Sequence, residues 1–263
     1  MVELSIKYNL IDLNNCMSEF DRLSSLINRF TLQVTPTLAA PVNLVILQDI
    51  QTGQPSQIML APLSHLPKLK LVGECVMFSA RTAWGRNNPL FASLPDLIKV
   101  NIHGNSHLTV LARLIKIESD AQCCGLRGVL NRLGEVLIIS IFRQQIEMGT
   151  NAPGLLNVLA DRRLSKAIVS MHDAPGKLWS NENLADLAGL SRSRFTQLFN
   201  QQMGQTAQSY LRHWRMILAS QDIERGDRIQ TIATRYGYGS SEALGRAFQQ
   251  QFGTNPIAHR RSL

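Results

Sequence analysis

Two stretches, LADLAGLSRSRFTQLFNQQMG at residues 184–204 and IATRYGYGSSEALGRAFQQQFG at residues 232–253, are copies of one pattern. Each begins with an apolar residue and Ala, reaches a Gly and an apolar residue, and continues through a Ser and an apolar-x-x-x-Phe run to a closing Gly. The copies lie 48 residues apart up to the turn and 49 after it, because Gly239 is an extra residue. This distance fits two small helical units joined by a helix.

The first copy predicts two helices with a tight turn between them. Apolar residues recur at three- and four-residue spacing before the turn, so one face of the first helix is apolar. Ser180 is the predicted N-cap of that helix, Gly189 its left-handed C-cap, and Ser191 the cap of the second helix. The residues predicted to line the buried side of the second helix are Phe195, Leu198 and Phe199. A helix, a short Gly-containing turn and a second, polar-faced helix are typical of a helix-turn-helix.

The second copy predicts the same unit, with Gly237 at the turn and Ser240 as the cap. Its second helix is predicted to bury Leu244, Ala247, Phe248 and Phe252. The two helix-turn-helix units are placed at about residues 182–203 and 229–252. Between them, residues 206–223 form an apolar-faced helix of roughly 27 Å at about 1.5 Å per residue. That length suits two recognition helices in successive major grooves, which are about 34 Å apart.

The outer faces of the two second helices are the predicted DNA-binding surface. One helical pattern alone occurs in many hairpins that bind no DNA, so the repetition carries the inference. The candidate DNA-binding residues are Arg192, Ser193, Thr196, Gln197 and Asn200 in the first unit, and Ser241, Glu242, Gly245 and Arg246 in the second.

The charge distribution agrees with a DNA-binding C-terminal part. Residues 161–263 hold 14 Lys and Arg against 8 Asp and Glu, whereas residues 1–160 hold 13 against 11. In the basic part Arg outnumbers Lys twelve to two. Arg forks match phosphate geometry, and basic side chains release counterions from DNA.

These residues resemble the DNA-binding domain of the AraC/XylS family of transcription regulators. The most specific part is the GY-x-S-S-x-x-x-x-R-A-F-x-x-x-F-G-x-x-P run at residues 237–256, and the match extends over about residues 159–261. The resemblance implies an all-α domain at residues 159–263, with two helix-turn-helix units joined by a connector helix. It also implies a sequence-specific regulator that binds double-stranded DNA, contacts RNA polymerase and activates transcription, although the residues themselves do not decide between activation and repression.

Some positions depart from the family pattern. Ala207 stands where Pro is usual, and Gln197 and Asn200 stand where Arg or Lys are common. Gln and Asn can read adenine through two hydrogen bonds, so these changes alter base preference more than they abolish it. Glu242 has two readings: an acceptor for a cytosine amino group, or a solvated carboxylate favoured by the helix dipole.

The N-terminal half predicts an α+β sensor domain at residues 1–154. Runs with β preference lie at residues 32–36, 41–50, 57–62 and 68–80, and helices are expected at residues 107–118 and 126–147. The segment NNPLFASLPDLIKV at residues 87–100 resembles family members with a cupin-like sensor. That resemblance implies a small β-barrel at about residues 30–100, helices at about 105–148 and a linker at about 149–154.

The sequence predicts neither a metal nor a cofactor. His65, His103 and His107 lack the His-x-His spacing of metal-binding cupins, and we expect them on the surface. Cys75, Cys123 and Cys124, like Cys16, are expected to be reduced and buried, with a redox role left open. An effector, small-molecule or redox, is implied only by the resemblance.

The helix at residues 126–147 is apolar over more than one face. It predicts a homodimer through residues 126–146, with Ile138 facing outward, while burial against its own sheet is the alternative. With no signal peptide and no apolar stretch long enough to span a bilayer, we expect a cytoplasmic protein without membrane contact.

Two other classes of protein fit the sequence less well. An enzyme is not favoured, because the sequence has no GxSxG, HExxH, P-loop or Rossmann motif, and its cysteines do not form the set of a DNA-alkylation repair protein. An architectural DNA-binding protein would not require an apolar domain of about 160 residues.

Overall fold

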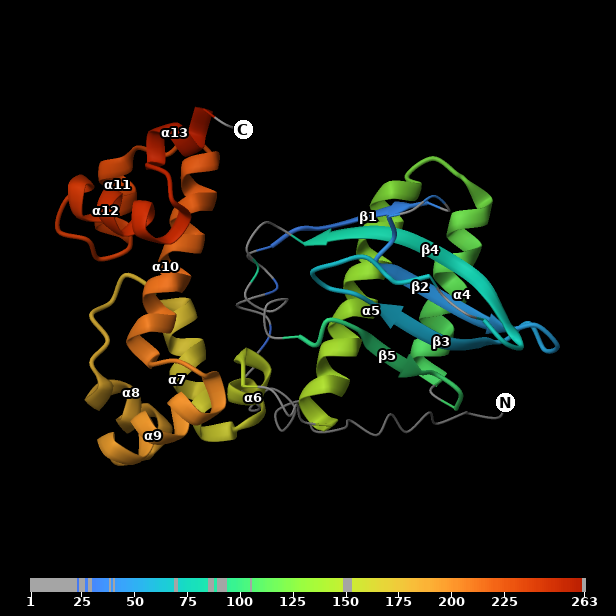
Figure 1. The fold of residues 1–263 in the computed structure, drawn as a ribbon, viewed down its shortest axis with the longest axis horizontal. Helices are drawn as coiled ribbons and strands as arrows, with labels where there is room; N and C mark the ends of the chain where they lie inside the picture. Colours follow the sequence, from blue (N-terminus) through green and yellow to red (C-terminus); the bar gives the residue numbers. More distant parts are fainter. Residues whose placement is uncertain are drawn as a thin grey trace, which may run out of the picture.

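The computed structural model describes residues 23, 27, 30–37, 39, 41–68, 71–84, 88, 94–104, 106–148 and 153–261. Several sequence-based expectations fall outside this part of the chain: Cys16, residues 149–152 of the linker, and residues 87 and 89–93 of the cupin-like segment. Figure 1 shows two lobes, a mixed α/β lobe and a helical lobe.

The N-terminal lobe contains one antiparallel sheet in the order β1-β4-β2-β3-β5. Its strands are β1 (Leu32–Pro36), β2 (Leu44–Asp49), β3 (Pro55–Leu60), β4 (Glu74–Trp84) and β5 (Ile98–Asn101). The first four overlap the four predicted runs, and β1 coincides with its run. Because β1 and β5 lie at opposite edges, the described strands form an open sheet. In the described residues, this open sheet stands where the small β-barrel was expected.

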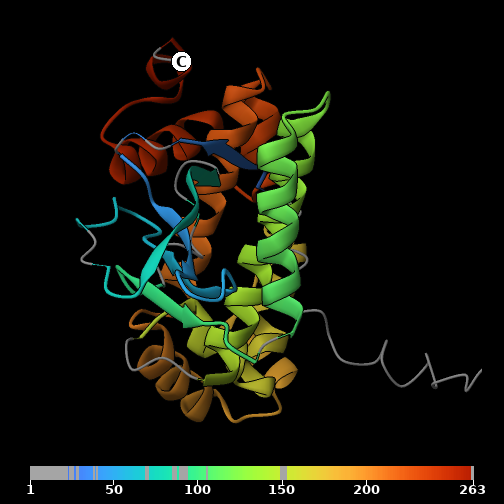
Figure 2. The ribbon, with the colours of Figure 1, turned by 90° about the vertical axis from the view of Figure 1, so that its right-hand side faces the viewer.

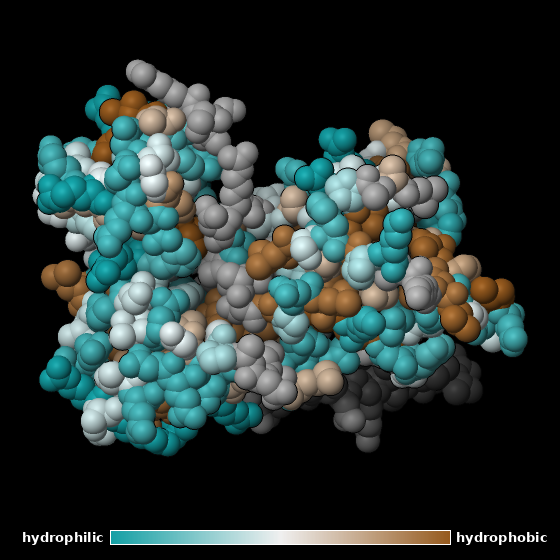
Figure 3. All heavy atoms as spheres, in the orientation of Figure 1, coloured by the Kyte–Doolittle hydropathy of each residue, from teal (hydrophilic) through white to brown (hydrophobic). Residues whose placement is uncertain are grey.

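Two long helices cover one face of this sheet, α4 (Ser106–Ala121) and α5 (Leu126–Met148), as Figure 2 shows most clearly. Alternate residues of the strands, among them Leu44, Ile46 and Ile58, face the core that the helices close. A Cβ on Gly134 of α5 would lie 2.6 Å from Val34 Cγ2, so the missing side chain lets the helix pass close to β1. The opposite face carries a smaller apolar cluster of Val45, Leu47 and Met59. Figure 3 views this side of the α/β lobe, where apolar side chains gather among polar ones.

The C-terminal lobe is entirely helical in its described residues. Its helices are α6 (Leu155–Ala160), α7 (Arg162–Asp173), α8 (Asn181–Ala188), α9 (Arg192–Met203), α10 (Ala207–Glu224), α11 (Ile229–Arg235), α12 (Ser241–Phe252) and α13 (Pro256–Arg261). The predicted α+β class, with a mixed N-terminal domain and an all-α C-terminal domain, is confirmed.

Short helix α6 connects the two lobes. It contacts α5, α7 and α9, and its four large apolar side chains are buried. The backbone N–H of Gly154, just before α6, donates to the carbonyl of Gln202 at the end of α9, at 2.8 Å. A second contact joins Phe30 to Trp214 of α10, with ring centroids 6.2 Å apart. The N-terminal lobe therefore contacts the first helical unit and the connector.

The apolar surface of α5 differs from the prediction. Ile138, expected to face outward, is fully buried, because β1, α4 and α6 surround this helix. The large apolar side chains that α5 exposes are Val129, Val136 and Met148. Neighbouring α4 exposes Val110, Leu114 and Ile117, which recur at four- and three-residue spacing and so form one stripe.

Candidate nucleic-acid interface

The first helix-turn-helix comprises α8 and α9, and its caps are those predicted. The Ser180 hydroxyl accepts from the Asn183 N–H in a capping box, and Ser191 accepts from the Arg194 N–H. Gly189 ends α8 with φ at +63°, in the left-handed region where a Cβ would be strained. The sequence therefore fixes the start of α9, and with it the direction in which each of its side chains points.

The face of α9 away from the core carries the predicted residues. Arg192, Ser193, Gln197 and Asn200 are exposed, and Thr196 is half-buried. Thr196 Oγ1 donates to its own helix at the Arg192 carbonyl, at 2.9 Å. On the opposite side, Phe195 and Phe199 are fully buried with their rings 5.5 Å apart. Because the buried rings fix the rotation of α9, its polar face points outward.

Two neighbours of these residues were not predicted. Glu182 of α8 forms an ion pair with Arg192 at 2.9 Å, and Arg194 donates to Gln197 Oε1 at 3.1 Å. Hydrogen bonds from its own backbone and from Ser180 hold the pKa of Glu182 below its ordinary value, and the charge of Arg192 adds to them. The Glu182 contact crosses the turn, so no spacing within one helix signals it.

The second unit, α11 and α12, repeats the geometry. Ser240 caps α12 by accepting from the Ala243 N–H, and Gly237 at the turn has a φ of +74°. On α12, Glu242 and Arg246 are exposed, whereas Ser241 and Gly245 are half-buried. Ser241 Oγ donates to Gln230 Oε1 of α11 at 2.5 Å. All nine candidate residues thus lie on the second helices of the two units, away from the buried stripes.

Glu242 and Gly245 have distinct local environments. A hydrogen bond from the Ser240 side chain, with one from its own backbone N–H, holds the pKa of the Glu242 carboxyl below its ordinary value. A Cβ on Gly245 would meet no heavy atom within 4 Å. Ser241, Glu242 and Gly245 also line a shallow pocket of about 720 Å³ between α11, α12 and α13. The exposed side of α12 is therefore indented where Gly245 has no side chain.

Connector α10 and the loop before α8 hold the two units together. Arg215 donates from Nε to the Pro175 carbonyl at 2.6 Å and from Nη2 to the Lys177 carbonyl at 2.9 Å. A Cβ on Gly176 would lie 2.1 Å from the Arg235 carbonyl oxygen, and one on Gly237 would lie 2.6 Å from the Gly176 carbonyl oxygen. Two glycines thus allow the first unit's loop to touch the second unit's turn.

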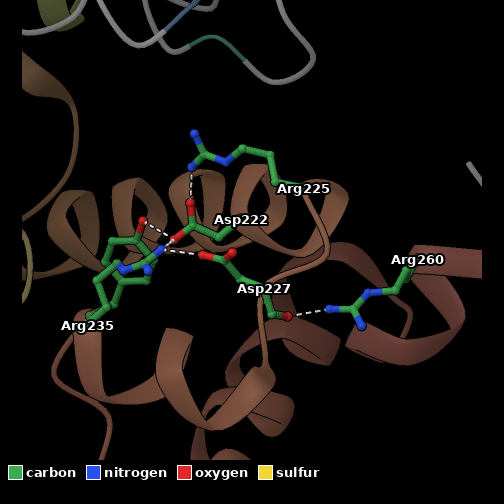
Figure 4. A network of polar contacts seen from close by, with 6 residues as sticks. Asp222, Arg225, Asp227, Arg235 and Arg260 are labelled. Carbon is green, nitrogen blue, oxygen red and sulfur yellow. Dashed lines mark hydrogen bonds and ion pairs between the residues drawn. The ribbon is translucent and has the colours of Figure 1, made fainter.

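A buried carboxylate fixes α11 against the end of α10 (Figure 4). Asp222 is fully buried and accepts from Tyr236 Oη at 2.7 Å and from Arg235 Nη1 at 2.5 Å, and it also contacts Arg225. Asp227 shares Arg235 at 2.6 Å. Burial raises the pKa of Asp222, but the hydrogen bonds from Tyr236, Arg235 and Arg225 together outweigh burial and lower it. Asp222 was not predicted, because its partners are brought together only by the fold.

Within the described part of the N-terminal lobe, no group of histidines, cysteines and carboxylates could hold a metal ion. His65, His103 and His107 are exposed, as expected. Cys75 is half-buried in β4, whereas Cys123 and Cys124 are exposed in the turn between α4 and α5. The expectation of buried cysteines is therefore wrong for the adjacent pair, because a short turn at the tip of a helical hairpin offers no core. None of the described helices is both long and apolar enough to cross a membrane.

Comparison with known proteins gives two domain matches. The profile of a helix-turn-helix domain family matches residues 184–262, and that of a cupin family matches residues 30–147. The chain joins a cupin domain to an AraC-type helix-turn-helix domain. The resemblance to the AraC/XylS family and the cupin-like nature of the N-terminal domain are thereby confirmed.

Relatives with this AraC-type domain are regulators by name. A putative AraC-like transcription regulator of Streptomyces lividans is 26% identical over 97% of this chain and 86% of its own length. The regulator AlkR of Acinetobacter baylyi is 32% identical over 66% of this chain and 58% of its own length. An uncharacterized HTH-type transcriptional regulator of Haemophilus influenzae is 27% identical, and the match covers 71% of this chain and 63% of that relative. The chain thus spans about three fifths of the length of the last two.

Two solved structures also match parts of the chain. The DNA-binding domain of AdpA, in complex with a target DNA, is 26% identical over 37% of this chain and 89% of its own, with a TM-score of 0.36. ToxT from Vibrio cholerae is 11% identical over 90% of this chain and 98% of its own, with a TM-score of 0.44.

Proposed function

We propose that this chain is a sequence-specific transcription regulator that reads two successive major grooves with α9 and α12 under the control of its N-terminal domain. The observation that carries the proposal is the duplicated, capped helix with an exposed polar face and a buried Phe brace. Helix-turn-helix proteins place such a second helix in the major groove of double-stranded DNA. Connector α10 spans about 27 Å and would hold the two helices for adjacent grooves.

The residues on these faces suggest their roles. Gln197 and Asn200 carry amides suited to adenine, whereas Arg192 and Arg246 carry guanidinium forks suited to guanine or phosphate. Ser193, Thr196 and Ser241 supply short hydroxyls, and Gly245 lets the duplex approach closely. The hydrogen bonds that Glu242 accepts from the Ser240 side chain and from its own backbone N–H favour the helix-start interpretation of that carboxylate over a cytosine contact.

Binding rather than catalysis is the proposed activity. In this reading the protein works in the cytoplasm beside the chromosome, contacts RNA polymerase and acts as an activator. The N-terminal domain would respond to an effector, either a small molecule or a redox signal. Helix α6 supports such control, because it contacts both α5 of the sensor domain and α9 of the DNA-reading domain.

We further propose that two copies pair through α4 and α5. The supporting observation is the exposed apolar stripe of α4, at Val110, Leu114 and Ile117, together with the exposed Val129 and Val136 of neighbouring α5. A stripe of this kind is typical of a helix face that packs on a partner. Two copies on repeated half-sites would multiply the specific contacts through effective concentration.

Selection from a random duplex pool tests the function. The full chain should enrich one sequence, and hydroxyl-radical footprinting should protect two segments about one helical turn apart. The doubly substituted variant Gln197→Ala/Arg246→Ala should enrich a different or weaker sequence while it keeps its melting temperature. If the wild-type chain enriches no sequence, the proposed function is wrong.

A further inference from the structure

A polar groove separates connector α10 from α12. It comprises two adjoining pockets of about 510 and 470 Å³ that share Arg212, Ala247 and Gln250. Arginine and glutamine side chains from both helices line it, among them Arg212, Arg215, Arg246, Gln208 and Gln250. No carboxylate is among the described residues that line either pocket, so the groove presents hydrogen-bond donors with net positive charge.

Its arginines differ from four other arginines of the C-terminal lobe, which are paired with carboxylates. Arg163 pairs with Asp161, Arg192 with Glu182, and Arg225 and Arg235 with Asp222. Within the described part of the chain, no ion pair of 4.0 Å or less includes Arg212, Arg215 or Arg246. The groove therefore brings together three arginine charges that have no carboxylate of the described residues within ion-pair distance.

Part of this groove is built in advance. The guanidinium of Arg215 is fixed by the carbonyls of Pro175 and Lys177, which are neutral acceptors and leave its charge in place. Burial raises the pKa of Tyr238, another lining residue, and the charges of Arg215 and Arg212 oppose that rise. Arg212 itself is exposed at the rim, so it can reach a ligand without a rearrangement of the fold.

The location of the groove points to its ligand. One wall is the first half of α10, which directly follows recognition helix α9, and the other wall is recognition helix α12. Arg246, a candidate DNA-facing residue of α12, also lines it, so a duplex that lies against the outer face of α12 reaches the groove. We propose that this groove binds the phosphodiester backbone of the DNA segment between the two major grooves, with Arg212 as the principal contact and the Gln208 and Gln250 amides as further donors. The inference rests on the proposed function and adds a phosphate site that carries no base recognition.

Salt dependence of binding tests the phosphate contact. The probe is the duplex enriched by the wild-type full chain, and the variant is Arg212→Gln. Loss of one phosphate contact should make the negative slope of log Kobs against log salt shallower by about 0.9. It should also weaken binding to all sequences alike. Arg163→Gln, an exposed arginine that is already paired with Asp161, is the matched control and should keep the wild-type slope. Both variants should melt like the wild type.

A neutral analogue of the phosphate group locates the Arg212 contact on the DNA. Methylphosphonates placed singly between the two footprinted segments should weaken wild-type binding at one or two positions, and Arg212→Gln should be insensitive at the same positions. An unchanged salt slope in Arg212→Gln, or equal methylphosphonate losses in both proteins, would overturn the inference while the proposed function stands. A wild-type chain that enriches no sequence would instead overturn the function and the inference together.

Discussion

Individual side chains on α9 and α12 carry the sequence preference in this proposal. Gln197→Ala and Arg246→Ala should each cost about 1–3 kcal/mol at one base pair, because each removes a side chain that reads a base edge. Affinities for all single-base variants of the selected duplex would measure this. Gln33→Ala, on an exposed position of β1, is the control and should change no affinity. An unaltered base preference in both variants would contradict the assignment.

Substitution of Gly245 should change the stability of the protein and its affinity for DNA in opposite directions. A Cβ at this position meets nothing within 4 Å, so Gly245→Ala should stabilise the helix by about 0.5–1 kcal/mol. The same methyl group would stand between α12 and the duplex, and DNA binding should weaken. Urea unfolding and a binding titration on one sample check both effects. Binding that improves together with stability would show that DNA does not approach this position.

The Asp222 network predicts a dependence of stability on pH. The folded-state pKa of Asp222 is lowered, so its contribution is present above the ordinary Asp value and is lost as pH falls through the lower folded value. Asp222→Asn should therefore destabilise the protein at pH 7, by about 1–3 kcal/mol because the arginine partners are partly exposed. The difference from wild type should shrink as the pH is lowered below 4. Asp186→Asn, an exposed carboxylate on α8, should show neither effect.

At the scale of the helix, each recognition helix depends on its buried aromatic stripe. The prediction that Phe199 and Phe248 are core residues is confirmed, since both are fully buried. The Phe248 ring also lies 4.6 Å from that of Phe252 and 5.3 Å from that of His259 in α13. Phe248→Ala should cost about 3–5 kcal/mol and abolish DNA binding with it. Phe252→Ala, which removes a half-buried ring, should cost less. Equal melting temperatures for Phe248→Ala and the wild type would refute the placement of Phe248 in the core.

The elements show what could be predicted from the sequence. Caps and turns follow local rules, so Ser180, Gly189, Ser191 and Ser240 lie where their residue types indicate. Strands and helices follow apolar periodicity, which predicted most of the sheet and both long helices. The exposed side of α5 could not be predicted, because periodicity shows that a side chain is apolar and not which neighbour covers it.

The same reason limited the prediction of the site. The candidate DNA-facing residues follow from the helical period, but the Arg192–Glu182 pair and the Asp222 network require the turns to bring distant residues together. The groove between α10 and α12 likewise cannot be predicted from the pattern of a single helix. Its cations are spread over two segments about thirty residues apart.

For the molecule as a whole, pairing of two chains is the central prediction. Leu114→Asp should halve the mass in sedimentation, because it places a charge in the α4 stripe without disturbing the core. It should weaken binding to a paired site more than to a single one. Ile50→Asp, an exposed apolar residue that lies in neither α4 nor α5, is the control and should change neither. A wild-type protein that sediments as a monomer at tens of micromolar would refute the dimer.

The contact between Gly176 and Gly237 has a consequence for operators. Because the loop of one unit touches the turn of the other, the two recognition helices have a set separation and a set relative rotation. One extra base pair between the two contacted grooves would shift the second by about 3.4 Å and turn it by about 34° around the duplex axis. The two helix-turn-helix units cannot move apart to follow that change. The spacing between the two contacted grooves therefore defines an operator as strictly as its bases do. A spacer insertion should then weaken binding as much as a mutation in either half, even with every contacted base intact.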